Sequence, residues 1–343
     1  MTPRFRMRPA RLADLDAFLQ MAEESGPGFT SLPVDGDLLT TRLRMSVEAF
    51  GETSKQTDYA QYLMMLEDIE TGEVGGCSAV KAGIGVKTPF FNYRIITLAQ
   101  VSREVGRQFN LDALTLTNEL IGYTEVGTLF IREKFRGQGA GGLVAQARYM
   151  LMKTAPDRFG ENVLAELRGV VDHDGRAPFW DHLGAHFFRM SFAEADRLSA
   201  TTDQQFILDL MPKYPIYVDL LPPEAREVIG RCHADGVPAL KMLEREGFSF
   251  ERVVDIFDGG PIVEAKRDMI RTVRETRRVK VDVGDAEGQR GLIATTELHH
   301  FAVTDLVGAF GAGDTFIAPK EVLETLGLKP GDAALVWVRS DQK

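Results

Sequence analysis

The stretch that most restricts the fold of this chain is LFIREKFRGQGAGGLVAQARYMLM, residues 129–152. It begins as an apolar run that stops at Arg132 and continues through a charged turn containing four glycines. An apolar segment with helical periodicity follows, and we expect a helix over 141–154. A strand, a glycine-rich turn and a helix in direct succession indicate an α/β fold.

This turn predicts a site for an anion. The first amides of a helix have no intrahelical acceptor and carry a partial positive charge. Glycines let a phosphate approach those amides without meeting a Cβ atom, and Arg136 can add a charge-assisted hydrogen bond. The stretch contains no GxxxxGK[ST] phosphate loop, and residues 132–135 separate the glycines from the preceding strand, unlike in the GxGxxG dinucleotide loop. A glycine turn that only caps the helix is the alternative.

Length and charge narrow the class of protein. The chain has 343 residues, enough for about two domains, and its net charge of −10 disfavours nucleic acids and anionic membranes as partners. The N-terminal segment has no secretory pattern, and no apolar run approaches the ~20 residues of a membrane span. Two cysteines, Cys77 and Cys232, form no disulfide framework. We therefore expect a cytoplasmic protein.

Patterning along the chain predicts two domains. The first, 1–265, is expected to contain a strand, two helices, a hairpin around residues 70–73, the strand of the glycine turn and its helix, and further strands with intervening helices. Its later elements are expected at 162–171 (strand), 177–188 (helix running into a strand), 222–248 (two helical stretches) and 249–261 (strand). PFWDHLGAHFF and PALKMLEREGF share a layout that suggests a possible internal duplication. The second domain, 270–343, reads as a small β-rich, barrel-like unit.

The form R-G-x-G-x-G after LFIREKF, within that order of elements, resembles the GNAT acyltransferase superfamily. The resemblance implies a GNAT-like acyl-CoA N-acyltransferase fold, with a small β-rich C-terminal domain added to it. It also implies that the coenzyme A diphosphate lies on the turn. The residues expected to bind the coenzyme are Leu129, Phe130, Ile131, Arg136, Gly137, Gly139, Gly141 and Gly142.

A closer resemblance covers nearly the whole chain. It rests on TSLP (30–33), FNYR (91–94), TLFI (128–131), LMPKYPIY (210–217), VIGRCH (228–233), EGF (246–248) and DIFDGGP (255–261). These segments resemble the arginine N-succinyltransferase family. The family implies transfer of succinyl from succinyl-CoA, a co-substrate and not a permanently bound cofactor, to the α-amino group of L-arginine. It also implies that Leu129 contacts succinyl-CoA and that His233 donates a proton. The family contains homo-oligomers and paired α and β subunits, and the segment after Asp282 matches it least well.

The chemistry is reasonable for these residues. Attack of a neutral amine on the thioester forms an oxyanion, which backbone donors along 127–131 can stabilise. The departing thiolate needs a proton, and a histidine such as His233 suits that step. Its neighbour Cys232 would point elsewhere on a helix, so we expect direct transfer in a ternary complex.

Both substrates carry charges that the protein must match. The distal carboxylate of succinyl needs a cation, for which Arg94 and Arg168 are candidates. The guanidinium of arginine needs carboxylates. Glu166, Asp255 and Asp258 lie in strand or turn settings that suit this role.

No metal is expected. His182 and His186 have the spacing of metal-binding helices, but Leu183 stands where the HExxH pattern has glutamate. His299 and His300 are adjacent on an expected strand, and adjacent strand residues point to opposite faces.

Two other functions compete. One is an acyltransferase that uses ornithine, another amine or acetyl-CoA. The other is a non-catalytic subunit or regulator, because FIAPKEVLETLGLKPGD (316–332) faintly resembles the swapped-hairpin barrels of DNA-binding regulators. The acidic balance opposes the DNA-binding version.

Overall fold

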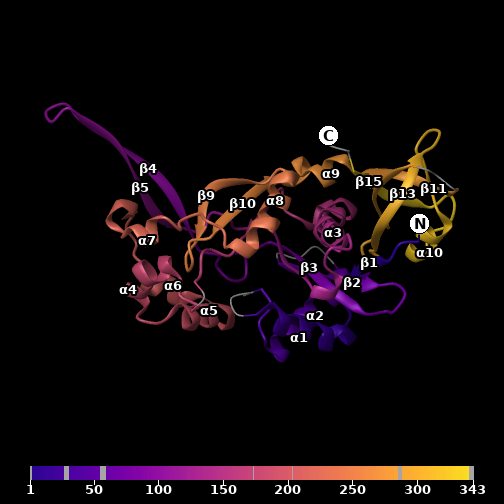
Figure 1. Cartoon of the computed structure of the whole chain (residues 1–343), viewed down its shortest axis with the longest axis horizontal. Helices are drawn as coiled ribbons and strands as arrows, with labels where there is room; N and C mark the ends of the chain where they lie inside the picture. Colours follow the sequence, from indigo (N-terminus) through magenta and orange to yellow (C-terminus); the bar gives the residue numbers. More distant parts are fainter. Residues whose placement is uncertain are drawn as a thin grey trace.

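The computed structural model describes residues 2–26, 31–54, 59–172, 174–202, 204–284 and 288–339. Thr30 of the TSLP segment lies outside the described residues. One mixed sheet runs through the molecule from the C-terminal barrel to the β4–β5 hairpin (Figure 1).

The centre of the sheet has the order β1-β2-β3-β6-β7-β10-β9. These strands are β1 (Phe5–Pro9), β2 (Ala60–Asp68), β3 (Val74–Ala82), β6 (Thr124–Ile131), β7 (Asn162–Glu166), β10 (Pro261–Lys266) and β9 (Ser249–Asp255). Helices α1 (Leu15–Ser25) and α2 (Gly36–Phe50) pack on one face, and α3 (Ala140–Thr154) packs on the other. Because both faces are covered, β2 is apolar and buried along nearly its whole length.

This arrangement confirms the GNAT-like order predicted from the sequence, including the hairpin around 70–73. β6 and β7 are parallel, yet they pair only at Thr124–Val163 and Glu125–Leu164. β6 then continues to Ile131 without β7 beside it. The two strands therefore diverge toward the glycine turn, and their carboxyl ends share one edge of the sheet.

Several predicted boundaries were wrong. The helix after the glycine turn begins at Ala140, and the strand expected over 162–171 ends at Glu166. The helix expected over 177–188 is π-helical from Trp180 to Gly184, continues as α4 (Ala185–Phe188) and is not followed by a strand. Gly184 allows the tight turn there, because a Cβ atom on it would lie 2.3 Å from the Trp180 ring.

The connection before β6 contains a long hairpin that was not predicted. β4 (Asn92–Ser102) pairs with β5 (Arg107–Thr117) along its full length. Only the base of this hairpin joins the sheet, through residues 92–94 beside β9 and 113–114 beside β8 (Ile216–Tyr217). The rest projects from the molecule (Figure 1).

Short helices cover the sheet near this hairpin and the end of β9. They include α5 (Phe192–Thr201), α6 (Gln205–Leu210) and α7 (Pro223–Arg226), and they form a second core with β4 and β9. α8 (Val237–Glu246) and α9 (Arg271–Glu275) lie nearer to α3.

The C-terminal part is β-rich, as expected. β11 (Arg277–Val283), β12 (Gln289–Ala294), β13 (Val303–Phe310), β14 (Thr315–Ala318) and β15 (Ala333–Val338) form a barrel with α10 (Lys320–Leu326). The barrel closes because β12 pairs with both β13 and β15. It also continues the main sheet, since β13 pairs with β1. Leu292 and Trp337 belong to the same core cluster as α3.

Candidate functional site

The residues of the glycine turn before α3, 137–139, are exposed, and Gly141 and Gly142 are half-buried. Gly139 occupies the N-cap position with φ 88°, and Gly137 has φ 74°, so a left-handed backbone explains both glycines. Gly141 has no such need, and a Cβ atom there would meet only the Ile131 side chain, at 3.9 Å. A glycine inside a helix costs about 0.5–1 kcal/mol relative to alanine. A ligand that approaches the helix amides would account for this cost.

No described side chain caps α3, and its first turn carries no acidic residue. The turn itself is held firmly. Phe135 is buried against Gly75, where a Cβ atom would lie 2.7 Å from its ring. Arg136 donates from Nε to the carbonyl of Ile131 at 2.9 Å, and its side chain remains exposed beside the turn. The amides and one cation are therefore preorganised for an anion.

A second cation reaches this turn from the barrel. Arg339 follows β15, and its Nη2 lies 3.2 Å from the position of a Cβ atom on Gly142. Its only ionic contact among the described residues is a loose one of 3.8 Å to Asp305. Arg132, in contrast, is paired with Glu24 at 2.7 Å. Sequence reasoning missed Arg339, because nothing in the local pattern links it to a helix nearly 200 positions earlier.

The free edge of β6 is distorted beside the turn. Thr128 has φ 50°, and the register with β3 shifts between Cys77 and Ala79, so β6 carries a bulge. Leu129 is half-buried, whereas the Phe130 side chain packs in the core under α1 and α2. The guanidinium carbon of Arg136 lies 5.9 Å from the centroid of the Phe130 ring. Past Glu125, no described β7 residue pairs with β6, which leaves this edge open to a ligand.

A second feature lies where β7 and β9 end. Asp258 accepts hydrogen bonds from the amides of Gly169 at 2.7 Å and Gly260 at 2.8 Å. A Cβ atom on Gly260 would lie 2.2 Å from the carbonyl oxygen of Leu167. Asp255 accepts from the amide of Asp258 at 2.8 Å. The DGGP turn is thus interlocked with the segment after β7, and only glycine fits at the contact.

Carboxylates gather at this junction, which we call the acidic crevice: Glu166, Asp196, Asp255 and Asp258. Solvent reaches the Glu166 side chain, but the dense protein around its carboxyl group desolvates it. This desolvation, followed by the charge of Asp255, raises its pKa well above the usual range. Burial and Asp255 likewise raise the pKa of Asp258, despite its two amide donors. Burial raises the pKa of Asp196 to about 6, with Asp255 adding to the shift and Arg168 opposing it. Carboxylates that repel one another in this way favour a bound cation.

His233 is tied to the same junction. Its amide donates to the carbonyl of Arg168 at 2.8 Å. Its Nδ1 accepts from the amide of Asp235 at 3.2 Å, which caps the short helix Ala234–Gly236. A neutral imidazole that accepts at Nδ1 carries its proton on Nε2. This hydrogen bond therefore selects the tautomer with its proton on Nε2, and the Asp235 carboxylate lies 3.6 Å from Nδ1.

Two residues near His233 bear on the other expected roles: Arg168 as a cation for the substrate, and Cys232 as a possible nucleophile. The Nε of Arg168 is buried without a hydrogen-bond partner in the described part of the chain, so this nitrogen can still donate to a ligand. Cys232 contacts the carbonyl of His233 at 3.3 Å, and burial raises its thiol pKa, with Asp258 adding to the effect. A thiol in that state is a poor nucleophile.

Asn92 was overlooked in the sequence although it belongs to the FNYR segment. It is fully buried, it lies opposite Asp255 in the β4–β9 pairing, and neither its Oδ1 nor its Nδ2 has a partner among the described residues. Arg94, the residue chosen from that segment, instead pairs with Glu119 at 2.7 Å and donates to the Glu251 carbonyl at 2.6 Å. The structure does not place it with the acidic crevice.

The expected strand at His299 and His300 was wrong. β12 ends at Ala294, and the two histidines lie in the following turn with ring centroids 4.1 Å apart. None of the described helices is both long and apolar enough to span a bilayer.

Comparisons with known proteins agree with the fold and the motifs. The family model described as "Arginine N-succinyltransferase beta subunit" matches residues 5–272. The arginine N-succinyltransferase of Escherichia coli O6:H1 is 39% identical over 346 residues, which cover 98% of each chain. That of Salmonella paratyphi B is 40% identical with the same coverage. The solved structure of arginine/ornithine succinyltransferase subunit AI from Pseudomonas aeruginosa superposes with a TM-score of 0.88 at 31% identity, covering 98% of this chain and 99% of that one.

Proposed function

This chain belongs to the arginine N-succinyltransferase family, and on that premise we propose that it transfers succinyl from succinyl-CoA to the α-amino group of L-arginine. One observation carries the assignment to this site. An uncapped helix N-terminus that suits a diphosphate opens beside the diverging strands β6 and β7, and the acidic crevice lies where β7 ends. The crevice suits a cationic amino acid.

The coenzyme would lie along the glycine turn and the free edge of β6. The amides of Gly141 and Gly142 would bind the diphosphate, with Arg136 and Arg339 supplying positive charge. The pantetheine amide groups would pair with the backbone of β6, as a further strand would. The bulge at Thr128 turns the backbone locally, which suits a donor aimed at the thioester oxygen.

The amino acid would enter from the acidic crevice. Its guanidinium would pair with Asp196, Asp255 or Asp258, which relieves the repulsion among these carboxylates. Arg168, with its unpartnered Nε, would hold the distal carboxylate of the succinyl group. Asn92, which lies opposite Asp255 and has an unpartnered amide group, would add a neutral contact.

The reaction then proceeds by direct attack. Glu166, whose raised pKa suits a base, takes a proton from the α-ammonium group. The amine nitrogen bonds to the thioester carbon, and the carbonyl electrons move to oxygen to form the oxyanion. As the carbonyl re-forms, the C–S bond breaks, and His233 in its imidazolium form gives the proton on Nε2 to the coenzyme thiolate, which leaves a neutral imidazole. The nitrogen loses its second proton to solvent, which leaves a neutral amide.

The assignment is tested by thiol release from the purified chain. Succinyl-CoA and acetyl-CoA are each offered with arginine, ornithine and lysine, and succinyl-CoA with arginine is expected to react fastest. No thiol release from that pair under any condition that keeps the chain folded would refute the function. Release by this chain alone would exclude a non-catalytic subunit.

Ornithine is the second candidate acceptor. The related Pseudomonas aeruginosa structure is titled as an arginine/ornithine enzyme. The acidic crevice can pair with either side-chain cation, and the acceptor panel separates the two. We also place the reaction in the cytoplasm, in keeping with the two free cysteines, Cys77 and Cys232.

A further inference from the structure

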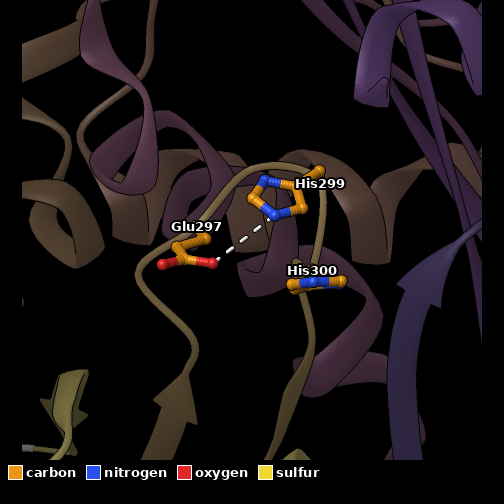
Figure 2. A group of neighbouring side chains, drawn as sticks. All are labelled: Glu297, His299 and His300. Atoms are coloured by element: carbon orange, nitrogen blue, oxygen red, sulfur yellow. Dashed lines mark ion pairs between the residues drawn. The ribbon is translucent and has the colours of Figure 1, made fainter. Parts of the chain in front are cut away.

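The turn between β12 and β13 gathers three side chains that commonly bind metals. Figure 2 shows Glu297 and His299 pointing toward each other, with His300 beside them. The distance from Nε2 of His299 to Oε2 of Glu297 is 3.5 Å. One ligand atom from each of the three residues lies within 4.8 Å of the others, and the described part of the chain contains no other such group.

The backbone holds this turn in place. The Thr295 hydroxyl donates to the carbonyl of His300 at 2.9 Å and accepts from the amide of Ala302 at 3.0 Å. The amide of Phe301 donates to the carbonyl of Leu298 at 3.2 Å. Phe301 is 1% exposed and stacks on Phe50 of α2. The ligands therefore project from a rigid turn, so little ordering is needed on binding.

From this geometry we propose that Glu297, His299 and His300 form a site for Zn²⁺ or a similar divalent transition metal. Imidazole nitrogen and carboxylate oxygen are the ligands that such ions prefer. With bonds of about 2.0 Å, two ligands of a tetrahedral site lie about 3.3 Å apart. Glu297 and His299 already have nearly this separation. A side-chain rotation of His300 closes the remaining gap.

The fourth position would face a cavity of about 1330 Å³ between the barrel and the start of the chain. Four arginines line this cavity, and their charge would oppose a cation. Arg6 and Arg8 are neutralised by Glu67, and Arg8 pairs also with Asp14 at 2.8 Å. Arg11 and Arg278 are exposed, so solvent and salt screen them. Asp332 adds negative charge to the wall, whereas Glu324 is paired with Lys320 at 3.1 Å.

The test is a calorimetric titration of the untagged, chelator-treated full chain with ZnCl₂, followed by CoCl₂ absorption spectra. We expect one equivalent to bind, with cobalt bands typical of low coordination number. His299→Ala and His300→Ala should each weaken binding at least about tenfold, because even groups outside the ligand shell contribute that much. Glu297→Gln should weaken Zn²⁺ binding less than either alanine substitution, since the amide oxygen of glutamine can still coordinate the ion weakly.

The matched control is the double variant His182→Ala/His186→Ala, which removes two imidazoles from the helical segment around Gly184. It should bind Zn²⁺ as the parent does. The proposal is overturned if the double variant His299→Ala/His300→Ala binds as tightly as the parent. It is equally overturned if the parent binds more weakly than about 1 mM. Both variants change partly or fully exposed side chains, and circular dichroism checks that they fold.

Discussion

The glycine turn and the acidic crevice attract opposite charges by different means. At the turn, the positive potential comes from backbone amides, so the sequence removes side chains to expose it. At the crevice, the negative potential comes from carboxylates, which backbone amides and glycine contacts hold close together. The backbone amides carry their partial positive charge whether or not a ligand is bound, and this costs the folded chain little free energy. In a carboxylate cluster without a bound cation, burial first and then mutual repulsion raise the pKa of the members.

The largest effect is expected at His233, which the chain ties to the crevice through Arg168. His233→Ala should lower turnover by about 10²–10⁴-fold, the usual contribution of a general acid, while the KM for each substrate changes little. Steady-state thiol release with each substrate varied measures both quantities. Cys232→Ser is the neighbouring control and should retain most of the turnover. Parental turnover in the His233 variant would remove this residue from the mechanism.

Gly141→Ala separates a ligand-binding turn from a turn that only caps the helix. The methyl group has room, and alanine is the better helix former, so the melting temperature should rise or stay level. The Kd for succinyl-CoA should nevertheless rise at least tenfold, since a charged hydrogen bond is worth about 1.5–3 kcal/mol. Thermal unfolding and calorimetry measure the two effects. An unchanged Kd would favour the capping interpretation.

Asp196→Asn tests the self-repulsion of the crevice. The folded chain keeps the Asp196 proton up to about pH 6, whereas an unfolded aspartate loses it near pH ~3.9. The retained proton therefore stabilises the folded chain below about pH 4, and this stabilisation is lost as the pH rises through about 6. Asparagine cannot ionise, so the variant should melt above the parent at pH ~7, with the gain vanishing near pH ~4.

The same variant should raise the KM for arginine about fivefold and leave the Kd for succinyl-CoA unchanged, because it removes one cation partner. Melting curves across pH and kinetics at neutral pH provide the measurements. A lower melting temperature at neutral pH would contradict the repulsion that distinguishes the two regions.

The smallest effect is expected at Arg339. Arg339→Ala should weaken succinyl-CoA binding about threefold, as an exposed ion pair usually does, and the loss should shrink at high salt. Arg290→Ala, next to it in the barrel, is the control and should bind normally. Titrations with succinyl-CoA at low and high ionic strength measure the loss of affinity and its dependence on salt. Equal affinities of the Arg339 variant and the parent for succinyl-CoA would mean that only the backbone amides and Arg136 bind the diphosphate at this turn.

Local patterns predicted the central sheet well and its surroundings poorly. β2 and β3 could be predicted from the sequence because both strands are buried, which requires apolar residues on either side of the turn that connects them. The β4–β5 hairpin was missed because much of it lies exposed outside the sheet, so burial imposes no clear alternation on it. His299 and His300 were misplaced because the strand before them ends at Ala294, before it reaches them.

The sequence by itself determined the order of the central elements, the glycine turn and the family, since these depend on residues that are contiguous in the chain. Only the tertiary structure brought Asn92, Asp196 and Arg339 to the two halves of the site. The physical reason is that electrostatic and hydrogen-bonding environments depend on distance in space. Residues separated by up to 200 positions therefore share a site without leaving a joint pattern in the chain.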